Sequence, residues 1–273
     1  MINEKLDLVI QGKYDSYVSG LIDHYSKLPF INKIIISDFE NGEIPKLNKV
    51  IHVTCPIPED PGTGNRNLQI ATSYNGLKAV TTNYAIKIRS DQKYSLICIE
   101  NMYKFFIENK ERELTFYEDS SKPKNSIITG GLFSPFPFHP RDHIFFGHIE
   151  DLLDLFNIPY ETPNFTKVYG IAKEYESWHY DKHIRTESYI GTHYCSNFNK
   201  KLKHFLKYPK VYLHDGSIKR DWAMKISNEI SHKIFKPVPS KFLDLEWPKY
   251  GWEEYRVDSQ RDIFGERWAE DFV

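Results

Sequence analysis

Residues Tyr84 to Asp91 read YAIKIRSD, an apolar strand pattern that ends on an acidic residue. In an open α/β sheet, ligands bind beyond the carboxyl ends of parallel strands, so Asp91 is placed to face a cleft. Carboxylates bind hard cations such as Mg²⁺ and Mn²⁺, and Arg89, on the same strand face, suits a phosphate group. We predict a cation- and phosphate-binding strand end; the alternative is that Asp91 caps a helix beginning near Ser95.

Apolar runs alternate with segments of helical spacing on both sides of this strand. Strands are predicted at residues 6–11, 31–37, 50–54, 84–89 and 126–129, and helices at 18–28, 67–83, 96–106, 149–156, 186–198 and 218–230. This alternation predicts an α/β fold with a mainly parallel central sheet flanked by helices. Prolines and flanking glycines predict an ordered, irregular loop at residues 130–147, and the Trp-rich tail has no clean period.

Length and charge limit the classes of function. The 273 residues suit one core with a C-terminal annex. Lys and Arg total 36 against 37 Asp and Glu, so the chain has no excess of positive charge that would favour nucleic-acid binding. Cys55, Cys98 and Cys195 lie too far apart in sequence for a zinc motif or a disulfide framework. The N-terminal apolar run is too short for a signal peptide, so we expect a cytoplasmic protein.

Several motifs in a fixed order carry a resemblance to a known family. They are the 6–11 strand ending in Gln-Gly, the strand ending in Ser37, the Asn65-Arg66-Asn67 helix start, the Lys87 to Asp91 segment, the Phe138 to Gly147 segment and the Arg185 to Tyr189 helix start. Together they resemble the WavE family, which is associated with lipopolysaccharide synthesis. The resemblance covers roughly Leu6 to Phe198.

The resemblance implies a GT-A-like nucleotide-sugar-binding fold and transfer of a sugar to a glycan or lipid-linked glycan acceptor. It divides the chain into a catalytic domain at 1–210, with a nucleotide-binding half at 1–91 and an acceptor-side half at 92–210, and an annex at 211–273 packed on the same domain. Arg89 stands where other GT-A enzymes carry the first acid of Asp-x-Asp. A divalent cation, Mn²⁺ or Mg²⁺, is expected at Asp91. A lipid-linked acceptor would bring the protein to the inner face of a membrane, and the tail either covers the site or forms a dimer contact.

Candidate donor-binding residues lie at strand ends and in cationic segments. A glycine lets the backbone approach a nucleotide, which favours the turn after the first strand, although a plain turn has the same sequence. The predicted nucleotide-sugar contacts are Gln11, Gly12, Lys13, Ser37, Arg66, Arg89, Ser90, Asp91, Lys219 and Arg220. His214 is a further candidate metal ligand, with an ordinary loop histidine as the alternative.

Two carboxylates compete as the catalytic base. If transfer inverts configuration, a carboxylate must take the proton of the acceptor hydroxyl. Glu187 is in the first turn of a predicted helix, where a carboxylate also stabilises the helix dipole. Asp142 lies among basic loop residues, and the alternative is that its carboxylate forms a structural salt bridge within the loop. Aromatic rings stack on sugars, so Phe138, His139 and Trp178 are predicted acceptor contacts, and packing against the core is the alternative.

Two other functions compete with sugar transfer. A metal-dependent hydrolase would use His139, Asp142 and His143, with His148 and Asp151 nearby, because these side chains are proper metal ligands. Pro140 interrupts any helix that would align the first two histidines. A non-catalytic protein that binds nucleotide sugars or glycans would keep the fold without turnover.

Overall fold

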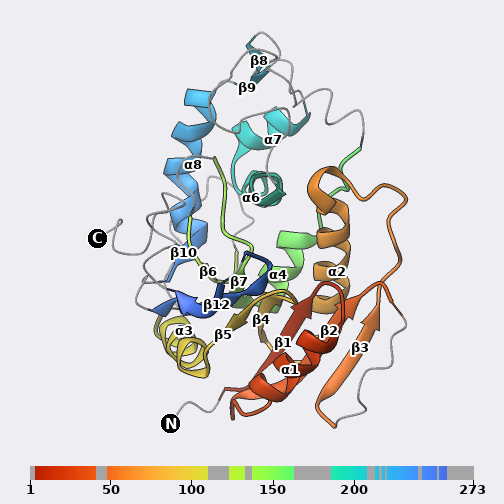
Figure 1. Cartoon of the computed structure of the whole chain (residues 1–273). Coiled ribbons are helices and arrows are strands. Elements are labelled where there is room, and N and C mark those ends of the chain that lie inside the picture. Colours follow the sequence, from red (N-terminus) through yellow and green to blue (C-terminus); the bar gives the residue numbers. More distant parts are fainter. Residues whose placement is uncertain are drawn as a thin grey trace.

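A seven-stranded sheet forms the centre of the computed structural model, with strand order β10-β6-β7-β4-β1-β2-β3 (Figure 1). The structure describes residues 4–40, 48–109, 123–132, 137–162, 186–207, 213–214, 217–218, 220–238, 242–250 and 252–256. Among these residues, no helix is long and apolar enough to cross a membrane.

The strands of the central sheet are β1 (Leu6–Gln11), β2 (Ile31–Asp38), β3 (Val50–Thr54), β4 (Tyr84–Arg89), β6 (Ile127–Thr129), β7 (Ile144–His148) and β10 (Phe235–Pro237). The helices that position the site are α1 (Ser16–Tyr25), α2 (Arg66–Lys78), α3 (Leu96–Asn109), α4 (Ile149–Phe156), α6 (Thr186–Ser196), α7 (Lys200–Lys207) and α8 (Arg220–Ile234). Smaller strands are β5 (Lys93–Tyr94), β8 (Leu213–His214), β9 (Ser217–Ile218), β11 (Leu245–Trp247) and β12 (Trp252–Arg256), and η1 (Thr63–Asn65) and η4 (Pro248–Tyr250) are 3₁₀ turns.

The direction of the strands confirms the predicted α/β class. Strands β4, β1, β2 and β3 run parallel to one another, as β10 does to β6, and β7 alone is antiparallel to both of its neighbours. The prediction of an irregular loop at 130–147 was wrong for its last part, because β7 begins at Ile144. An apolar run of Ile144, Phe145 and Phe146, flanked by loop residues, is too short to show strand periodicity.

The inner strands β1, β2 and β4 bury both of their faces. Leu8 and Ile10 of β1 pack with Tyr25 of α1 and Phe106 of α3, whereas Val9 between them packs on the opposite face with helices α2 and α4. Successive side chains of a strand point to opposite faces, so a continuous apolar run is what a doubly covered sheet requires. Figure 1 shows α6, α7 and α8 grouped beyond α4, away from α1 and α3.

A buried carboxylate fixes the connection between α2 and β4. The side chain of Asp7 accepts hydrogen bonds from the backbone and hydroxyl of Thr81 and from Asn32. Because these bonds hold the chain at Thr81 outside the helix, α2 ends at Lys78 and not near residue 83 as its spacing predicted. The connection delivers the chain to the start of β4, whose carboxyl end carries Arg89.

The C-terminal segment contributes strands to the body of the fold. Phe235 of β10 pairs with Ile127 of β6, and Leu245 of β11 pairs with Tyr94 of β5. In the Trp-rich tail at residues 243–273, the strands β11 and β12 have only three and five residues, which is why the sequence there has no clean period. We propose that residues 211–273 form an annex of the same domain.

Candidate active site

A cavity of about 450 Å³ opens at the carboxyl ends of β1, β2 and β4. Its lining combines strand ends with the start of α2 and one residue of the C-terminal segment: Gln11, Gly12, Lys13, Phe39, Glu40, Gly64, Asn65, Leu68, Gln69, Thr72, Arg89, Ser90, Asp91 and Lys249. This is the edge of a parallel sheet at which ligands bind in open α/β folds. Parallel alignment of β1 and β4 brings Gln11 opposite Arg89.

The floor of the cavity depends on a close backbone approach at Gly12. Its φ angle is +126°, a conformation that residues other than glycine rarely adopt. The Gly12 amide donates to the Ser37 carbonyl at 3.1 Å, and the Ser90 amide donates to the Gln11 carbonyl at 2.9 Å. A Cβ atom on Gly12 would lie 2.4 Å from the Ser90 hydroxyl oxygen.

Replacing Gly12 with alanine is therefore expected to destabilise the fold by about 1–3 kcal/mol and to weaken binding in the cavity. The backbone strain and the clash with Ser90 act together. Urea unfolding measures the effect. Gly20→Ala is the matched control, because Gly20 lies exposed in α1 with nothing within 4 Å of an added Cβ, so this change should stabilise by about 0.5–1 kcal/mol. Equal stability of Gly12→Ala and wild type would contradict the account.

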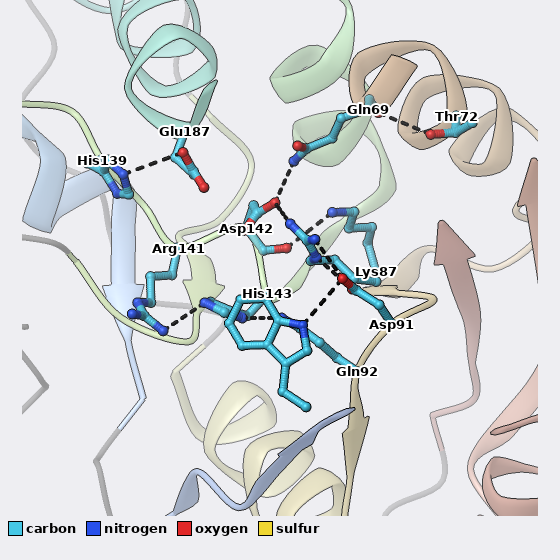
Figure 2. Close-up of polar contacts among 12 residues, drawn as sticks. Gln69, Thr72, Lys87, Asp91, Gln92, His139, Arg141, Asp142, His143 and Glu187 are labelled. Atoms are coloured by element: carbon cyan, nitrogen blue, oxygen red, sulfur yellow. Dashed lines mark hydrogen bonds and ion pairs between the residues drawn. The ribbon is translucent and has the colours of Figure 1, made fainter. Parts of the chain in front are cut away.

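Arg89 joins two carboxylates at the wall of the cavity. Its Nε and Nη2 atoms donate to the two oxygens of Asp91, both at 2.9 Å, and Nη1 donates to Asp142 Oδ2 at 2.9 Å. Gln69 Nε2 also donates to Asp142 Oδ2, at 2.7 Å (Figure 2). The side chain of Asp142 is only 4% exposed, whereas those of Arg89 and Asp91 are 24% and 31% exposed. The guanidinium is thus held by carboxylates on two sides, on a side chain that is partly exposed at the cavity.

The charges of this cluster set its protonation. Burial alone would raise the pKa of Asp142, but the charges of Arg89 and Lys87 outweigh it and hold that pKa well below its usual range. Asp91 behaves alike: burial opposes ionisation, and the hydrogen bonds and charge of Arg89 lower its pKa. Burial also lowers the pKa of Lys87 to about 8, against the attraction of Asp142. Both carboxylates are therefore ionised at neutral pH.

Trp247 of the C-terminal segment covers one side of the cluster. Its indole nitrogen donates to Asp91 Oδ2 at 3.3 Å, and the Arg89 guanidinium carbon lies 5.5 Å from its ring centroid. The ring also meets His143 edge-on, with 4.7 Å between centroids. A cation over an indole face is favourable, especially where water is excluded. Trp247 thus packs over the Arg89–Asp91 pair, which the sequence alone did not indicate.

Glu187 lies at the start of α6, facing the cluster from another side. Its Oε2 atom is 3.5 Å from His139 Nε2, and Figure 2 shows the two side chains together above Asp142. Burial and the negative charge of Asp142 raise the pKa of Glu187 to about 7. The side chain keeps 24% exposure. A Cβ atom added to Gly64, which lines the cavity, would lie 4.0 Å from the Thr186 hydroxyl oxygen, so the start of α6 lies near the cavity, although no α6 residue is part of its lining.

The sequence profile of the WavE lipopolysaccharide synthesis family matches residues 32–230, well over half of the chain. This chain belongs to the WavE lipopolysaccharide synthesis family. A search of curated proteins found no match. The predicted family is thus confirmed, and its match spans α2, β4, β7 and α6, the elements that carry most of the residues just described. The sheet of this WavE-family chain is consistent with a GT-A-like fold.

Some predicted donor contacts of this WavE-family chain lie together at the cavity, and others do not. Gln11, Gly12, Lys13, Arg89, Ser90 and Asp91 all line it. Ser37 does not: it is fully buried, and its hydroxyl donates to the Thr72 carbonyl at 2.6 Å. Lys219 and Trp178 lie outside the described residues, as do the side chains of Arg220 and His214.

Arg66 was predicted to meet phosphate, but it is a buried structural residue. It is 1% exposed, pairs with Glu161 at 3.1 Å and lies 4.8 Å from the centroid of the Tyr189 ring. Glu161 also accepts hydrogen bonds from the backbone and hydroxyl of Thr63. These contacts tie α2 to α6 and to the segment after α4.

Glu161→Gln is expected to destabilise the fold by about 3–5 kcal/mol, because it removes the carboxylate that pairs with the buried Arg66 charge. Chemical denaturation measures this loss. Lys124→Gln is the control: Lys124 pairs with Glu150 at the surface, where both side chains are more than half exposed, and its loss should cost at most about 1 kcal/mol. If Arg66 instead served the ligand, Glu161→Gln would alter nucleotide affinity while leaving stability near that of wild type.

Phe138 was predicted to contact an acceptor, and the structure places it in the core. It is 2% exposed, its amide donates to Ser227 at 2.7 Å, and its carbonyl lies against Gly191 of α6. An added Cβ on Gly191 would lie 2.0 Å from that carbonyl oxygen, so the glycine is required for this packing. Of the predicted acceptor contacts with described positions, His139 is the one at the site.

The residues of the alternative hydrolase site are engaged elsewhere. His143 contacts Gln92 and Arg141, His148 accepts the Glu150 amide at the start of α4, and Asp151 accepts two backbone amides. Across the described ranges, no three His, Cys, Asp or Glu side chains gather as a metal site. The geometry therefore does not support the hydrolase.

A divalent cation at Asp91, as predicted, does not fit the side chains as they are arranged. Both oxygens of Asp91 accept from Arg89, and Oδ2 also accepts from Trp247. The guanidinium lies between Asp91 and Asp142, where a cation bridging them would have to bind. The alternative role of Asp91 as a helix cap is wrong, because the Ser95 hydroxyl accepts the Cys98 amide at the start of α3.

Gln69, Lys87, Trp247 and Glu161 were not identified from sequence. Lys87 offered the clearest signal, since a lysine within a buried apolar strand needs a partner. Its Nζ donates to the Asp142 carbonyl at 3.1 Å. The others come from segments far along the chain, and their convergence follows from tertiary packing.

Proposed function

We propose that this WavE-family chain is a glycosyltransferase that moves a sugar from a nucleotide-sugar donor to a glycan or lipid-linked glycan in lipopolysaccharide or a comparable surface polysaccharide. Family membership assigns it to lipopolysaccharide synthesis in general. The observation that carries the specific proposal is the cavity at the ends of β1 and β4, which Arg89 lines, with Glu187 outside this lining but close enough to Asp142 to feel its charge.

The donor occupies this cavity in our proposal. A volume of about 450 Å³ lies within the range of small-molecule sites. The Gly12 turn lets the backbone approach the nucleotide, and Arg89, Lys13 and Lys249 supply positive charge for the phosphates. Lys13 also pairs with Glu40 at 3.5 Å, and both side chains are mostly exposed, so this contact yields readily to a stronger anion.

Glu187 is the better base of the two predicted carboxylates. A base works best with a pKa near the working pH, which Glu187 has at about 7. Asp142 is buried, accepts from Arg89 and Gln69, and has a pKa far too low to hold a transferred proton. For an inverting transfer, the acceptor oxygen bonds to the anomeric carbon, the bond to the phosphate oxygen breaks, and the hydroxyl proton passes to Glu187.

His139 then positions the base and the acceptor. Its Nε2 atom faces Glu187, and the side chain retains 10% exposure. An imidazole beside the base can hold its carboxylate in place and contact an incoming hydroxyl. An acceptor carried on a lipid would bring this rim of the molecule to the inner face of a membrane.

A thermal-shift screen of UDP-, GDP-, CMP- and dTDP-sugars tests the proposed function. A ligand that binds the native state raises the melting temperature by mass action, so one nucleotide class should do so. Release of free sugar from that donor would then demonstrate turnover. Binding without release to water or to any glycan would favour the non-catalytic alternative, and no shift with any nucleotide would contradict the proposal.

A further inference from the structure

The Arg89 guanidinium is bound as a metal ion would be. Three of its N–H groups meet three carboxylate oxygens, two from Asp91 and one from Asp142, each at 2.9 Å. Fork-shaped pairing of this kind fixes a guanidinium in both position and orientation. Gln69 and Trp247 donate to the same two carboxylates and restrain them in turn.

The guanidinium keeps capacity for a ligand. It has five N–H donors, and its contacts within the described part of the chain use three. Arg89 lines the cavity and its side chain is 24% exposed, so the remaining donors belong to a group that solvent or a ligand can reach. The charges of Asp142 and Asp91 outweigh burial and raise its pKa further, so the positive charge is permanent.

We propose that Arg89 is the cation that neutralises the donor phosphates, held by Asp91 and Asp142 in the place of a divalent metal, so that donor binding is independent of metal. The inference rests on the proposed function. As the bond between sugar and phosphate breaks, its electron pair stays on the phosphate oxygen, and the Arg89 N–H groups donate to the charge that develops there. Lys13 and Lys249 add positive charge at the same cavity.

Asp91 would have opposite effects on phosphate binding depending on whether it binds a divalent metal or holds Arg89. As a metal ligand it would be required for phosphate binding, and Asp91→Asn would abolish it. As the holder of Arg89 it partly neutralises the guanidinium, so Asp91→Asn should leave Arg89 bound to Asp142 with a stronger field toward the cavity. The variant should bind nucleotide diphosphates severalfold more tightly than wild type.

Calorimetric titration with UDP, GDP and dTDP, in EDTA and then in Mg²⁺ or Mn²⁺, tests the inference on wild type, Asp91→Asn and Arg89→Lys. We expect one nucleotide to bind wild type equally in EDTA and in metal, more tightly to Asp91→Asn, and at least tenfold more weakly to Arg89→Lys, which keeps the charge but loses the fork. Circular dichroism checks that each variant is folded. If Arg89→Lys does not fold, the nucleotide affinity of Asp91→Asn still distinguishes a metal ligand at Asp91 from a residue that holds Arg89.

The possible failures are distinguishable. Binding that requires metal and is lost in Asp91→Asn would overturn the role of Arg89 while leaving the proposed glycosyltransferase intact. Metal-free binding that Arg89→Lys leaves unchanged would overturn the role of Arg89 as well. If none of the three nucleotides binds in EDTA or in metal, the inference fails, and the proposed function fails with it when the CMP-sugars of the thermal-shift screen also give no shift.

Discussion

Replacing Glu187 with glutamine is expected to lower sugar transfer by about 10²–10⁴-fold while donor binding persists. The amide keeps the size and polarity of the side chain but cannot accept the acceptor proton. In wild type, kcat/KM should rise with pH up to about 7 and then level off, because Glu187 must be ionised to act and its pKa is about 7. Initial rates measured across this pH range check both expectations.

Glu150→Gln is the matched control for Glu187→Gln. Both glutamates are in the first turn of a helix, but Glu150 begins α4 at the exposed surface. If the role of Glu187 were only to stabilise a helix end, each variant would lose about 0.3–1 kcal/mol of stability. Both variants would then keep full activity. Full activity of Glu187→Gln would contradict the assignment of the base.

The pKa of Glu187 also has a consequence for stability. Folding raises this pKa, so between the unfolded value and about 7 the folded state holds more protons than the unfolded state. The stability conferred by the protonated group is therefore lost as pH rises through about 7. Glutamine does not titrate, so Glu187→Gln should not show this loss. The difference in stability between the variant and wild type should therefore shift in favour of the variant from pH 5 to pH 8, and thermal unfolding at the two pH values measures it.

Replacing Arg89 with methionine is expected to destabilise the protein by about 3–5 kcal/mol and to abolish nucleotide binding. The change leaves the buried carboxylate of Asp142 without its main compensating charge. In wild type the lowered pKa of Asp142 contributes stability above its unfolded pKa that is lost as pH falls; the variant should lose much of this contribution at neutral pH. Urea unfolding and nucleotide titration measure the two effects.

Lys93→Met provides the comparison for Arg89→Met. Lys93 pairs with Glu246 at 2.9 Å between β5 and β11, where the two side chains are 29% and 16% exposed. Both side chains of this pair are more exposed than Asp142, so the pair should contribute at most about 1 kcal/mol, and it lies outside the cavity lining. If Arg89→Met were no more damaging than Lys93→Met, the cluster would not hold the site together.

The sequence predicted the parallel part of the fold well. Strands β1 and β4 match the predicted ranges because buried parallel strands have continuous apolar runs, and the half-buried edge strand β3 matches its range as well. It missed β7 and β10, which have five and three residues and lie beside loops. Short strands form because they pair with neighbouring strands of the sheet, and this pairing leaves no periodic pattern in the local sequence.

The site shows the same contrast between residues that local sequence predicts and contacts that only tertiary packing creates. Gly12, Arg89 and Asp91 were predicted because they follow strands, and strand ends of a parallel sheet meet at one edge. The mutual engagement of Arg89 and Asp91 was not predicted, since side chains two apart on a strand end can meet only if the chain turns between them. Trp247 lies 156 positions from Asp91 along the chain, so only the tertiary structure joins them.

The central claim is that a nucleotide sugar binds at the ends of β1 and β4. Hydrogen–deuterium exchange of the whole chain, with each nucleotide sugar of the screen at saturating concentration, tests it most directly. The account predicts that one nucleotide class slows exchange of backbone amides at residues 11–13 and 89–92 and leaves those of α3 unchanged. Unaltered exchange at both strand ends with every nucleotide, or protection confined to another face of the molecule, would contradict it.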